Sequence, residues 1–431
     1  MKKNRTLNIA IIGLGNIGAY LFNYLKKNKI ILSKKNNCTP NIVYVSAKNI
    51  IKKRNININK KIWLKNYLDA TKLDNVDIIV ELIGGAEGPA KKLVFNALKN
   101  KKHVVTANKA LIAKYGDQLS KIAEENNVNL EFEAAVCGGV PIIRSLKESL
   151  IANKINKVYG IFNGTSNYIL STMDKENKSF NDVLVTAQKL GYAETNPISD
   201  LNGGDVGAKL KILSSLCFNS FLSNKIHIEG MEYIDKVDID NANNLGYKIK
   251  LLGVSEIINN NVYQRVHPTL IKNTSYIAGI DGVLNAVIVD GKPVGQSIIQ
   301  GEGAGPEATT SALVSDISSI LRGNIKFPFS ISNKERKKIR FKSIDDRFFS
   351  AYMRFEVIDK PGVLSNITNI YSKNKVSIKR LIQNPNKSKK FSSIIIITHN
   401  AKDKFLNKIL KQIEKKTYII KKPKLIRIDL N

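Results

Sequence analysis

The chain has 431 residues, of which 43% are hydrophobic and 24% charged, a composition typical of folded proteins with apolar cores. Its 68 Lys and Arg residues outnumber 36 Asp and Glu residues and give a net charge of +32, but they are dispersed among Asn and Ile rather than gathered in an aromatic-containing stripe. We therefore expect neither nucleic acid nor a membrane as a partner. A basic nucleic-acid-binding or amino-acid-sensing regulator remains an alternative.

The cysteines and histidines offer no metal or disulfide framework. Cys38, Cys137 and Cys217 are far apart in the sequence, and no CxxC pair or zinc-ligand histidine spacing occurs. The N-terminal stretch has the basic start and apolar run of a signal peptide, but glycines interrupt the run and no small-residue cleavage pattern follows it. We expect a mature, cytoplasmic protein.

The first element, "LNIAIIGLGNIGAYLFNYLKKN" (7–28), predicts a buried strand, a glycine turn and an amphipathic helix. Gly13 permits the tight turn, Gly15 lets a pyrophosphate approach the backbone, and Gly18 allows the helix to pack closely on the strand. Asn16 and Ile17 begin the helix, whose free N–H groups would face the phosphates. This arrangement predicts a dinucleotide site.

The second strand, "NIVYVSA" (41–47), should end near the ribose of that dinucleotide. Proteins that prefer NAD usually carry an acid there, which binds the 2′-hydroxyl. This chain instead has Lys48, Lys52, Lys53 and Arg54. Basic side chains suit a 2′-phosphate, so we expect NADP, with NAD as the alternative.

Strands and helices continue to alternate through "VDIIVELIGG" (76–85), "PAKKLVFNALKN" (89–100) and "KHVVTAN" (102–108). The alternation predicts an α/β fold with a Rossmann-type, doubly wound parallel sheet. Ligands of such sheets bind beyond the carboxyl ends of the strands. Gly84, Thr106 and Lys109 all fall at those ends.

Farther along, "AETNPISDLNGGDVGAK" (193–209) gathers Glu194, Asp200 and Asp205 ahead of Lys209. The simplest interpretation is a loop and a helix that Asp200 or Asp205 caps, with Asp205 and Lys209 as a solvated i,i+4 pair. The alternative is a functional cluster of carboxylates and lysine.

Taken together, the motifs resemble homoserine dehydrogenase over nearly the whole chain. That family interconverts L-homoserine and L-aspartate 4-semialdehyde with a nicotinamide cofactor. The similarity rests on segments in the same order: "GLGNIG", "VELIGG" (80–85), "VVTANKALIA" (104–113), "FEAAVCGGVPII" (132–143), "GIFNGTSNYIL" (160–170), "GYAETNPISDLNGGDVGAKLKI" (191–212), "RVHPTL" (265–270) and "GEGAGPEATTSALVSDI" (301–317).

The resemblance implies roles for individual residues. Lys209 would lie beside the reacting alcohol as the acid–base group, with Lys109 on the cofactor side, and we expect burial and the Lys109 charge to lower the pKa of Lys209. Carboxylates would hold the substrate ammonium. The implied substrate-binding residues are Glu194, Asp205, Asp200, Lys109, Gly191, Asn163 and Thr165, and the implied cofactor-binding residues are Gly13, Gly15, Asn16, Ile17, Gly18, Lys48, Gly84, Thr106, Lys109, Gly191, Glu194 and Gly303.

The turn "EAAVCGGVP" (133–141) would, by the same resemblance, bind a monovalent cation such as sodium. Its ligands would be Glu133 and the carbonyl groups of Val136, Gly138 and Val140, since a hard cation prefers oxygen. A simple glycine turn before a proline is the alternative. Cys137 also lies in this turn. An alternative function, aspartate-semialdehyde dehydrogenase, would need a nucleophilic cysteine, but the sequence shows no histidine partner for Cys137.

One position departs from the family pattern. Relatives commonly have an acid where this chain has Asn196, so a negative charge is missing from a loop near the substrate. This change could weaken binding of the ammonium, but it leaves the acid–base lysine in place.

The C-terminal region predicts strand–helix–strand–strand–helix–strand, a ferredoxin-like module, and "DKPGVL" (359–364) resembles the ACT domain. Gly362 could admit an amino-acid carboxylate, so we expect feedback by L-threonine, with a purely oligomerising module as the alternative. An open sheet in the middle region would pair subunits into a homodimer or homotetramer. The expected parts are a dinucleotide-binding domain (1–132, plus a helix at 303–325), a substrate and dimerisation domain (133–302), a basic linker (330–347) and an ACT-like domain (348–431).

Overall fold

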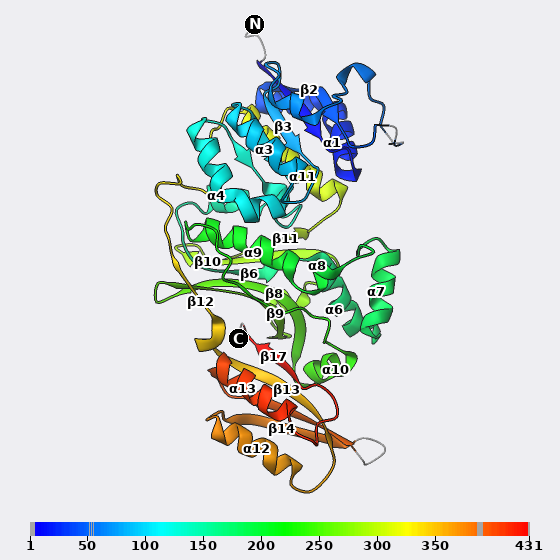
Figure 1. Ribbon diagram of the computed structural model, residues 1–431, viewed down its shortest axis with the longest axis vertical. Coiled ribbons are helices and arrows are strands. Elements are labelled where there is room, and N and C mark those ends of the chain that lie inside the picture. Colours follow the sequence, from blue (N-terminus) through cyan, green and yellow to red (C-terminus); the bar gives the residue numbers. More distant parts are fainter. Residues whose placement is uncertain (1–4, 51, 53, 55, 386–390, 430–431) are drawn as a thin grey trace.

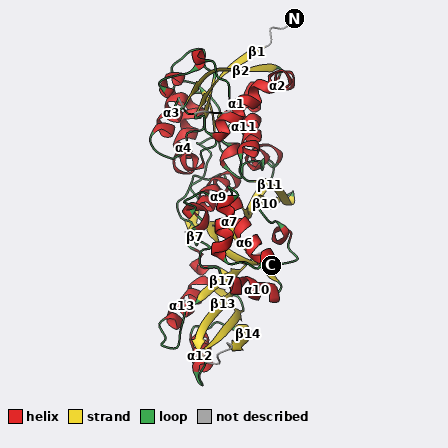
Figure 2. Cartoon of the chain, turned by 90° about the vertical axis from the view of Figure 1, so that its right-hand side faces the viewer, coloured by secondary structure: helices red, strands yellow, loops and turns green. Residues whose placement is uncertain are grey.

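The computed structural model describes residues 5–50, 52, 54, 56–385 and 391–429. The chain forms three parts stacked along one long axis, with the N-terminus at one end (Figure 1). A view turned by 90° shows the same stacking, and the last strand, at Lys424–Ile428, lies near the boundary between the second and third parts (Figure 2). Within the described ranges, no helix has the length and apolar character needed to cross a membrane.

The first part is built on a five-stranded parallel sheet, which confirms the Rossmann-type prediction. The strand order is β2-β1-β3-β4-β5. Its strands are β1 (Arg5–Ile12), β2 (Cys38–Ser46), β3 (Ile78–Glu81), β4 (His103–Thr106) and β5 (Leu130–Glu131). Four consecutive residues of β1, from Ile9 to Ile12, are buried because helices cover both faces of the sheet.

The helices of this part are α1 (Asn16–Lys27), α2 (Lys29–Asn36), α3 (Pro89–Lys99) and α4 (Lys109–Glu125), with short 3₁₀ turns at Lys60–Ile62 and Tyr67–Thr71. A distant helix, α11 (Pro306–Leu321), returns and packs beside α1. Its apolar face, including Leu313 and Ile317, joins the core under β1.

The second part contains a largely antiparallel sheet of long strands in the order β11-β10-β6-β8-β9. These are β6 (Lys154–Ile161), β8 (Tyr247–Ile258), β9 (Asn261–Lys272), β10 (Leu284–Lys292) and β11 (Gly295–Glu302). The helices are α5 (Ile142–Arg144), α6 (Gly164–Glu176), α7 (Phe180–Lys189), α8 (Ile198–Leu201), α9 (Gly204–Cys217) and α10 (Lys236–Asn244), with a π turn at Ser145–Ser149 and 3₁₀ turns at Glu133–Ala135 and Tyr276–Gly279. Helix α9 is buried between this sheet and α4, so it joins the first part to the second.

The third part has the predicted ferredoxin-like order of β13 (Phe348–Ile358), α12 (Val363–Lys373), β14 (Ile378–Pro385), β15 (Phe391–Thr398), α13 (Asp403–Glu414) and β17 (Lys424–Ile428), with a short β16 (Ala401–Lys402) and a 3₁₀ turn at Ile344–Asp346. Its sheet runs β17-β13-β15-β14. A separate core, which includes Phe355, Ile367 and Leu406, fills this part.

The sheets of the second and third parts are continuous. Strand β17 pairs in parallel with β9, where Arg427 lies opposite Thr269. Two fully buried arginines reinforce this junction. Arg427 forms ion pairs with Asp403 at 2.6 Å and with Glu229 at 2.8 Å, and Arg265 of β9 donates to Asp429, just after β17, at 3.1 Å. Because a buried charge is costly unless it is paired, these contacts hold the last strand in one register.

The expected basic linker is an ordered part of the structure. Arg336 is buried and donates hydrogen bonds to Asp117 on α4 and to the carbonyl of Ser220. Its guanidinium also stacks against Phe329 and Phe221. Strand β12 (Arg340–Lys342) then pairs with β9, as does the short β7 (His227–Ile228). The segment therefore fastens the third part to both others.

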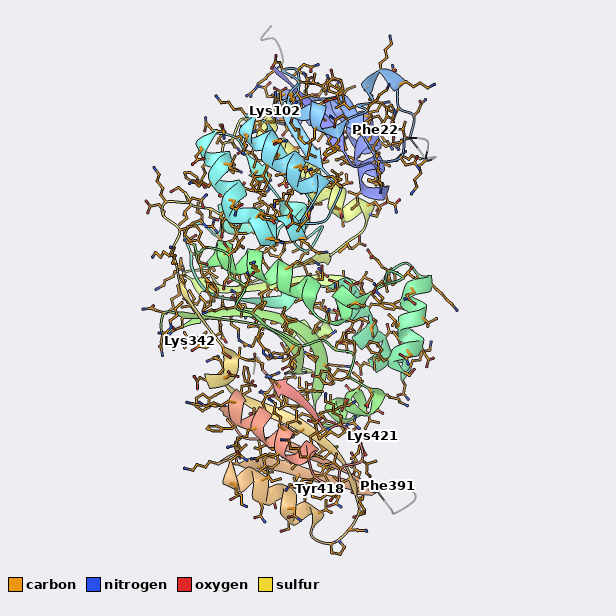
Figure 3. All side chains as sticks on the ribbon, viewed as in Figure 1. Phe22, Lys102, Lys342, Phe391, Tyr418 and Lys421 are labelled. Atoms are coloured by element: carbon orange, nitrogen blue, oxygen red, sulfur yellow. The ribbon has the colours of Figure 1, made fainter. Side chains whose placement is uncertain are left out.

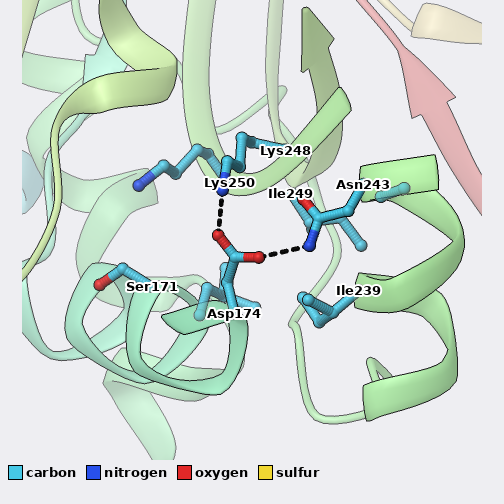
Figure 4. A pocket seen from close by; sticks show the side chains of 9 residues that line it. Ser171, Asp174, Ile239, Asn243, Lys248, Ile249 and Lys250 are labelled. Atoms are coloured by element: carbon cyan, nitrogen blue, oxygen red, sulfur yellow. Dashed lines mark hydrogen bonds and ion pairs between the residues drawn. The ribbon is translucent and has the colours of Figure 1, made fainter. Parts of the chain in front are cut away.

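Polar contacts also fix α6 and α10 on β8. Figure 4 shows Asp174 of α6 between Asn243 of α10 and Lys248 of β8, both of which donate to its carboxylate. Nearby, the buried Lys250 donates to Asn167 at 3.0 Å and to Asp281 at 2.8 Å. The space between these side chains is about 10 Å³, roughly the room for a single water molecule.

Candidate active site

A cavity of about 540 Å³ lies at the junction of the first and second parts. Lys109 reaches it from the first turn of α4, just beyond the carboxyl end of β4. Asn163, at the start of α6, and Asp205 and Lys209 on α9 approach it from the second part. The remaining lining residues are Gly164, Thr165, Leu190, Gly191, Tyr192, Glu194, Asp200, Val283, Glu302, Gly303, Ala304 and Gly305.

Asp205 is the centre of the charged cluster. One carboxylate oxygen, Oδ1, is 2.6 Å from Lys109 Nζ, and the other, Oδ2, is 2.8 Å from Lys209 Nζ. Gly203, with φ of 82°, starts α9 without a side-chain cap, so the capping interpretation of Asp200 and Asp205 is wrong. Asp205 is 3% exposed and Lys209 is 7% exposed. The expectation that they form a solvent-exposed i,i+4 pair is therefore wrong as well.

Asn163 fixes the orientation of two carboxylates. Its Oδ1 accepts a hydrogen bond from the Ser166 N–H and caps α6, while its Nδ2 donates to Asp200 and Asp205, both at 2.8 Å. The Lys209 ammonium donates to the Phe162 carbonyl at 2.6 Å as well as to Asp205. The cluster is therefore preorganised by the end of β6 and the start of α6.

The electrostatics of Lys209 differ from the expectation. Burial lowers the pKa of Lys209, but the acidic groups around it, Asp205 foremost, outweigh burial and raise the pKa above its ordinary value. The expected depression by Lys109 is wrong because Asp205 lies between the two ammonium groups and neutralises their repulsion. Burial raises the pKa of Asp205, but the charges of Lys209 and Lys109 hold it well below its usual range.

The other expected substrate residues surround the same cavity. Thr165 donates to the Tyr192 carbonyl at 2.5 Å, which joins α6 to the loop that follows α7. Gly191, in that loop, has φ of 75°. Burial raises the pKa of Asp200, and the hydrogen bond from Asn163 only partly offsets this. Asn196 is exposed and does not line the cavity. Sequence reasoning did not single out Tyr192 and Glu302, although both lie in segments that carry the family resemblance, and it missed Val283, which lies outside them.

A second cavity, of about 640 Å³, lies over the carboxyl ends of β1 and β2. Gly13 and Gly15 form its floor, and a Cβ on Gly13 would lie 2.4 Å from the Leu82 carbonyl oxygen. A Cβ on Gly18 would lie 2.0 Å from the Gly13 oxygen, whereas nothing lies within 4 Å of a Cβ on Gly15. The backbone at Gly15 is therefore open to a ligand, and Asn16 and Ile17 follow it as the first residues of α1.

Basic residues line the far end of this cavity. Lys48, Lys52 and Lys65 are among its walls, and no Asp or Glu is. Arg54 also lines it, but its guanidinium donates to the carbonyl oxygens of Leu14, Lys52 and Asn49 and so holds the loop in place. Lys53 lies outside the described residues.

Gly84, in the turn after β3, and Thr106, at the end of β4, line neither of the two cavities described above. The Thr106 hydroxyl donates to Glu81 at 2.6 Å, and the Glu81 carboxylate accepts from the N–H groups of Ile83 and Gly84 at 2.8 and 3.0 Å. This chain of hydrogen bonds shapes the turn after β3.

The turn at 133–141 packs against Glu302 and Gly303, which line the first cavity. The Glu133 carboxylate accepts from the N–H groups of Ile143 and Arg144 at 2.8 and 2.7 Å. Gly139 donates to the Glu302 carbonyl at 2.9 Å, and a Cβ on Gly138 would lie 2.5 Å from the Gly303 carbonyl oxygen. Burial raises the pKa of Cys137 to about 11, so this thiol is not a ready nucleophile.

The shared carboxylate predicts a stability difference between two neighbouring acids. Asp205→Asn should lower the free energy of unfolding by about 3 kcal/mol at neutral pH, since it leaves the buried Lys209 ammonium without its ion-pair partner. Asp200→Asn is the matched control and should cost less than about 1 kcal/mol, because Asp200 has only a hydrogen bond from Asn163 to lose. Urea denaturation measures both, and equal losses would contradict the central position of Asp205.

Three family descriptions match the chain: "Homoserine dehydrogenase, NAD binding domain" over residues 13–133, "Homoserine dehydrogenase" over 141–318, and "AHAS small subunit-like ACT domain" over 353–421. The homoserine dehydrogenase of Neisseria gonorrhoeae is 37% identical over 99% of both chains, and that of Helicobacter pylori is 37% identical over 100% of both. The crystal structure of a homoserine dehydrogenase from Thiobacillus denitrificans superimposes with a TM-score of 0.91 at 36% identity, covering 99% of this chain and 98% of that one. The chain therefore belongs to the homoserine dehydrogenase family of NAD(P)-dependent oxidoreductases, with a C-terminal ACT-like domain.

Proposed function

We propose that this protein is an NADP-preferring homoserine dehydrogenase that uses Lys209 as its acid–base group. The observation that carries the proposal is the buried ammonium of Lys209, held by Asp205 at 2.8 Å and by the Phe162 carbonyl at 2.6 Å at the wall of the substrate cavity. A reduced nicotinamide cofactor, once bound, would supply the hydride that the aldehyde carbon accepts in the reducing direction. Lys209, cationic in the free protein, donates a proton to the aldehyde oxygen, and in the oxidising direction it takes that proton back.

The substrate's own charges suggest how it would lie. Its ammonium needs a carboxylate, but both oxygens of Asp205 already bind lysines. Asp200 and Glu194, which line the same cavity, are therefore the better candidates for the ammonium. Lys109 is 43% exposed at its side chain against 9% for Lys209, which favours Lys209 for proton transfer and Lys109 for positioning.

Lys209→Met should lower kcat for L-homoserine oxidation by about a hundredfold or more, since it removes the acid–base group. Lys211→Met is the matched control: Lys211 lies on the same helix but donates to Asn224, away from the cavity, so this variant should keep nearly normal turnover. Absorbance of the reduced nicotinamide measures both, with circular dichroism to confirm folding. A Lys209→Met enzyme as active as the control would assign the proton transfer to another group.

NADP preference is supported by the lysines of the nucleotide cavity. Lys48→Ala and Lys65→Ala should each raise KM for NADP by about tenfold and leave KM for NAD nearly unchanged, because only NADP carries the 2′-phosphate. Lys61→Ala, an exposed lysine outside the cavity, serves as the control. Initial rates with each cofactor measure the difference, and a parallel change for both would contradict the 2′-phosphate assignment.

We also propose that the turn at 133–141 binds a monovalent cation such as sodium. The proposed ligands are the Glu133 carboxylate and the carbonyl oxygens of Val136, Gly138 and Val140. Glu133 already accepts two backbone N–H groups and the Val140 carbonyl accepts the Ile142 N–H, so a cation would have to share these oxygens. The cation would brace the turn against the Gly303 loop.

The midpoint of thermal unfolding should be about 2 °C or more higher in sodium chloride than in tetramethylammonium chloride of equal ionic strength, because a cation that binds the folded state stabilises it. Tetramethylammonium controls for ionic strength and is too large for such a turn. Equal midpoints in the two salts would argue against the site.

The ACT-like domain supports feedback by an amino acid such as L-threonine. A cavity of about 320 Å³ lies at the turn from β13 to α12, where Gly362 has φ of 88° and precedes the helix N-terminus. A saturating threonine titration that left activity unchanged would contradict this role. We further propose that the protein acts in the cytoplasm, in the biosynthesis of threonine, methionine and isoleucine, as a homodimer or homotetramer. The proposed domains are residues 1–132, 133–302 and 348–431.

A second candidate, an aspartate-semialdehyde dehydrogenase, is disfavoured by the environment of Cys137. The thiol is 1% exposed, and burial raises its pKa to about 11. A thioester mechanism needs a reactive thiolate. Activity that survives thiol alkylation would agree with the homoserine reaction.

A further inference from the structure

A further cavity, of about 400 Å³, lies between the second and third parts, far from the Gly362 turn in the sequence. The loop between β7 and α10 forms one wall through Glu229, Gly230, Glu232 and Tyr233. The opposite wall comes from α13 and the segment that leads into β17, in the order Asn407, Leu410, Lys422, Pro423, Lys424 and Leu425. Figure 3 labels Lys421, the residue just before that segment.

Most charged groups around this cavity are already paired. Glu229 accepts from His227 at 2.6 Å and from Arg427 at 2.8 Å, and Lys424 bonds Asp235 at 2.5 Å and Asp238 at 2.9 Å. Over the part of the chain that the structure describes, Glu232 and Lys422 have no ion pair or hydrogen bond. The cavity therefore presents one unpaired carboxylate and one unpaired ammonium.

The remaining lining is largely apolar, from Tyr233, Leu410, Pro423 and Leu425. A ligand that matches this lining needs a cation, an anion and a small apolar body, and its volume must be well below 400 Å³. A free amino acid in its zwitterionic form meets all these requirements. We propose that the cavity binds such an amino acid, with its ammonium on Glu232 and its carboxylate on Lys422.

The loop between β7 and α10 also contacts the end of α8, next to Asp200. Met231 N–H donates to the Leu201 carbonyl at 2.9 Å, at the end of α8. A Cβ on Gly230 would lie 2.8 Å from both the Leu201 oxygen and Asn202 Cα, and one on Gly203 would lie 3.0 Å from Ile228. A ligand that shifts or stiffens residues 228–231 thus acts directly on the turn between Asp200 and Asp205, and it changes the KM of the amino-acid substrate.

Titration calorimetry of the full-length protein without cofactor tests the site, with L-threonine, L-isoleucine and L-methionine as probes. At least one should bind, and Glu232→Gln and Lys422→Met should each weaken that binding by about tenfold or more. N-acetylation of the bound amino acid or reduction of its carboxylate to an alcohol should weaken it to a similar extent. Glu335→Gln and Lys421→Met, exposed residues outside the cavity, are charge-matched controls that should bind normally.

No binding by any of the three probes would overturn the proposal, as would binding that both cavity variants keep, since the ligand would then occupy another site such as the Gly362 turn. The coupling is tested by the KM for homoserine at saturating ligand, which should change in wild type but not in Glu232→Gln. An unchanged KM in a protein that binds the ligand would overturn the coupling. If homoserine is not turned over at all, the proposed reaction fails while the calorimetric result still decides the site.

Discussion

The proposed active site depends on one carboxylate that two lysines share. Asp205 binds Lys109 through one oxygen and Lys209 through the other, and the three groups come from the first and second parts of the chain. Without the carboxylate, two ammonium groups would face each other in a largely buried space. With it, the cluster forms an electrostatic bond between α4 and α9, and the cavity lies where these helices meet.

This arrangement determines the protonation state of Lys209 in the ligand-free protein. A lysine that is cationic in the free protein is prepared to donate a proton, which suits reduction of an aldehyde. In the oxidising direction, Lys209 would have to release its proton before it accepts the one from the alcohol.

Local patterns predicted the dinucleotide part, whereas the residues of the cluster around Asp205 were assigned through the resemblance to the family. The glycines at 13, 15 and 18 are predictive because turn, ligand approach and helix packing each impose a requirement within a few residues. The pKa direction of Lys209 was not predictable, because it depends on Asp205 lying between two lysines that are far apart in the sequence. For the same reason, the buried position of Arg336 and the pairing of β17 with β9 were missed, since both arise from partners distant in the chain.

The charge state of Lys209 is the most direct test of this account. Its side chain can be observed by NMR in protein labelled with ¹³C at lysine Cε, with the resonance assigned by its absence from Lys209→Met. We predict that the ligand-free protein shows a charged Lys209 throughout the neutral and mildly alkaline range, with a midpoint above that of an ordinary lysine. A midpoint near neutral pH would contradict the shared-carboxylate account and restore a mechanism in which Lys109 depresses the pKa of Lys209.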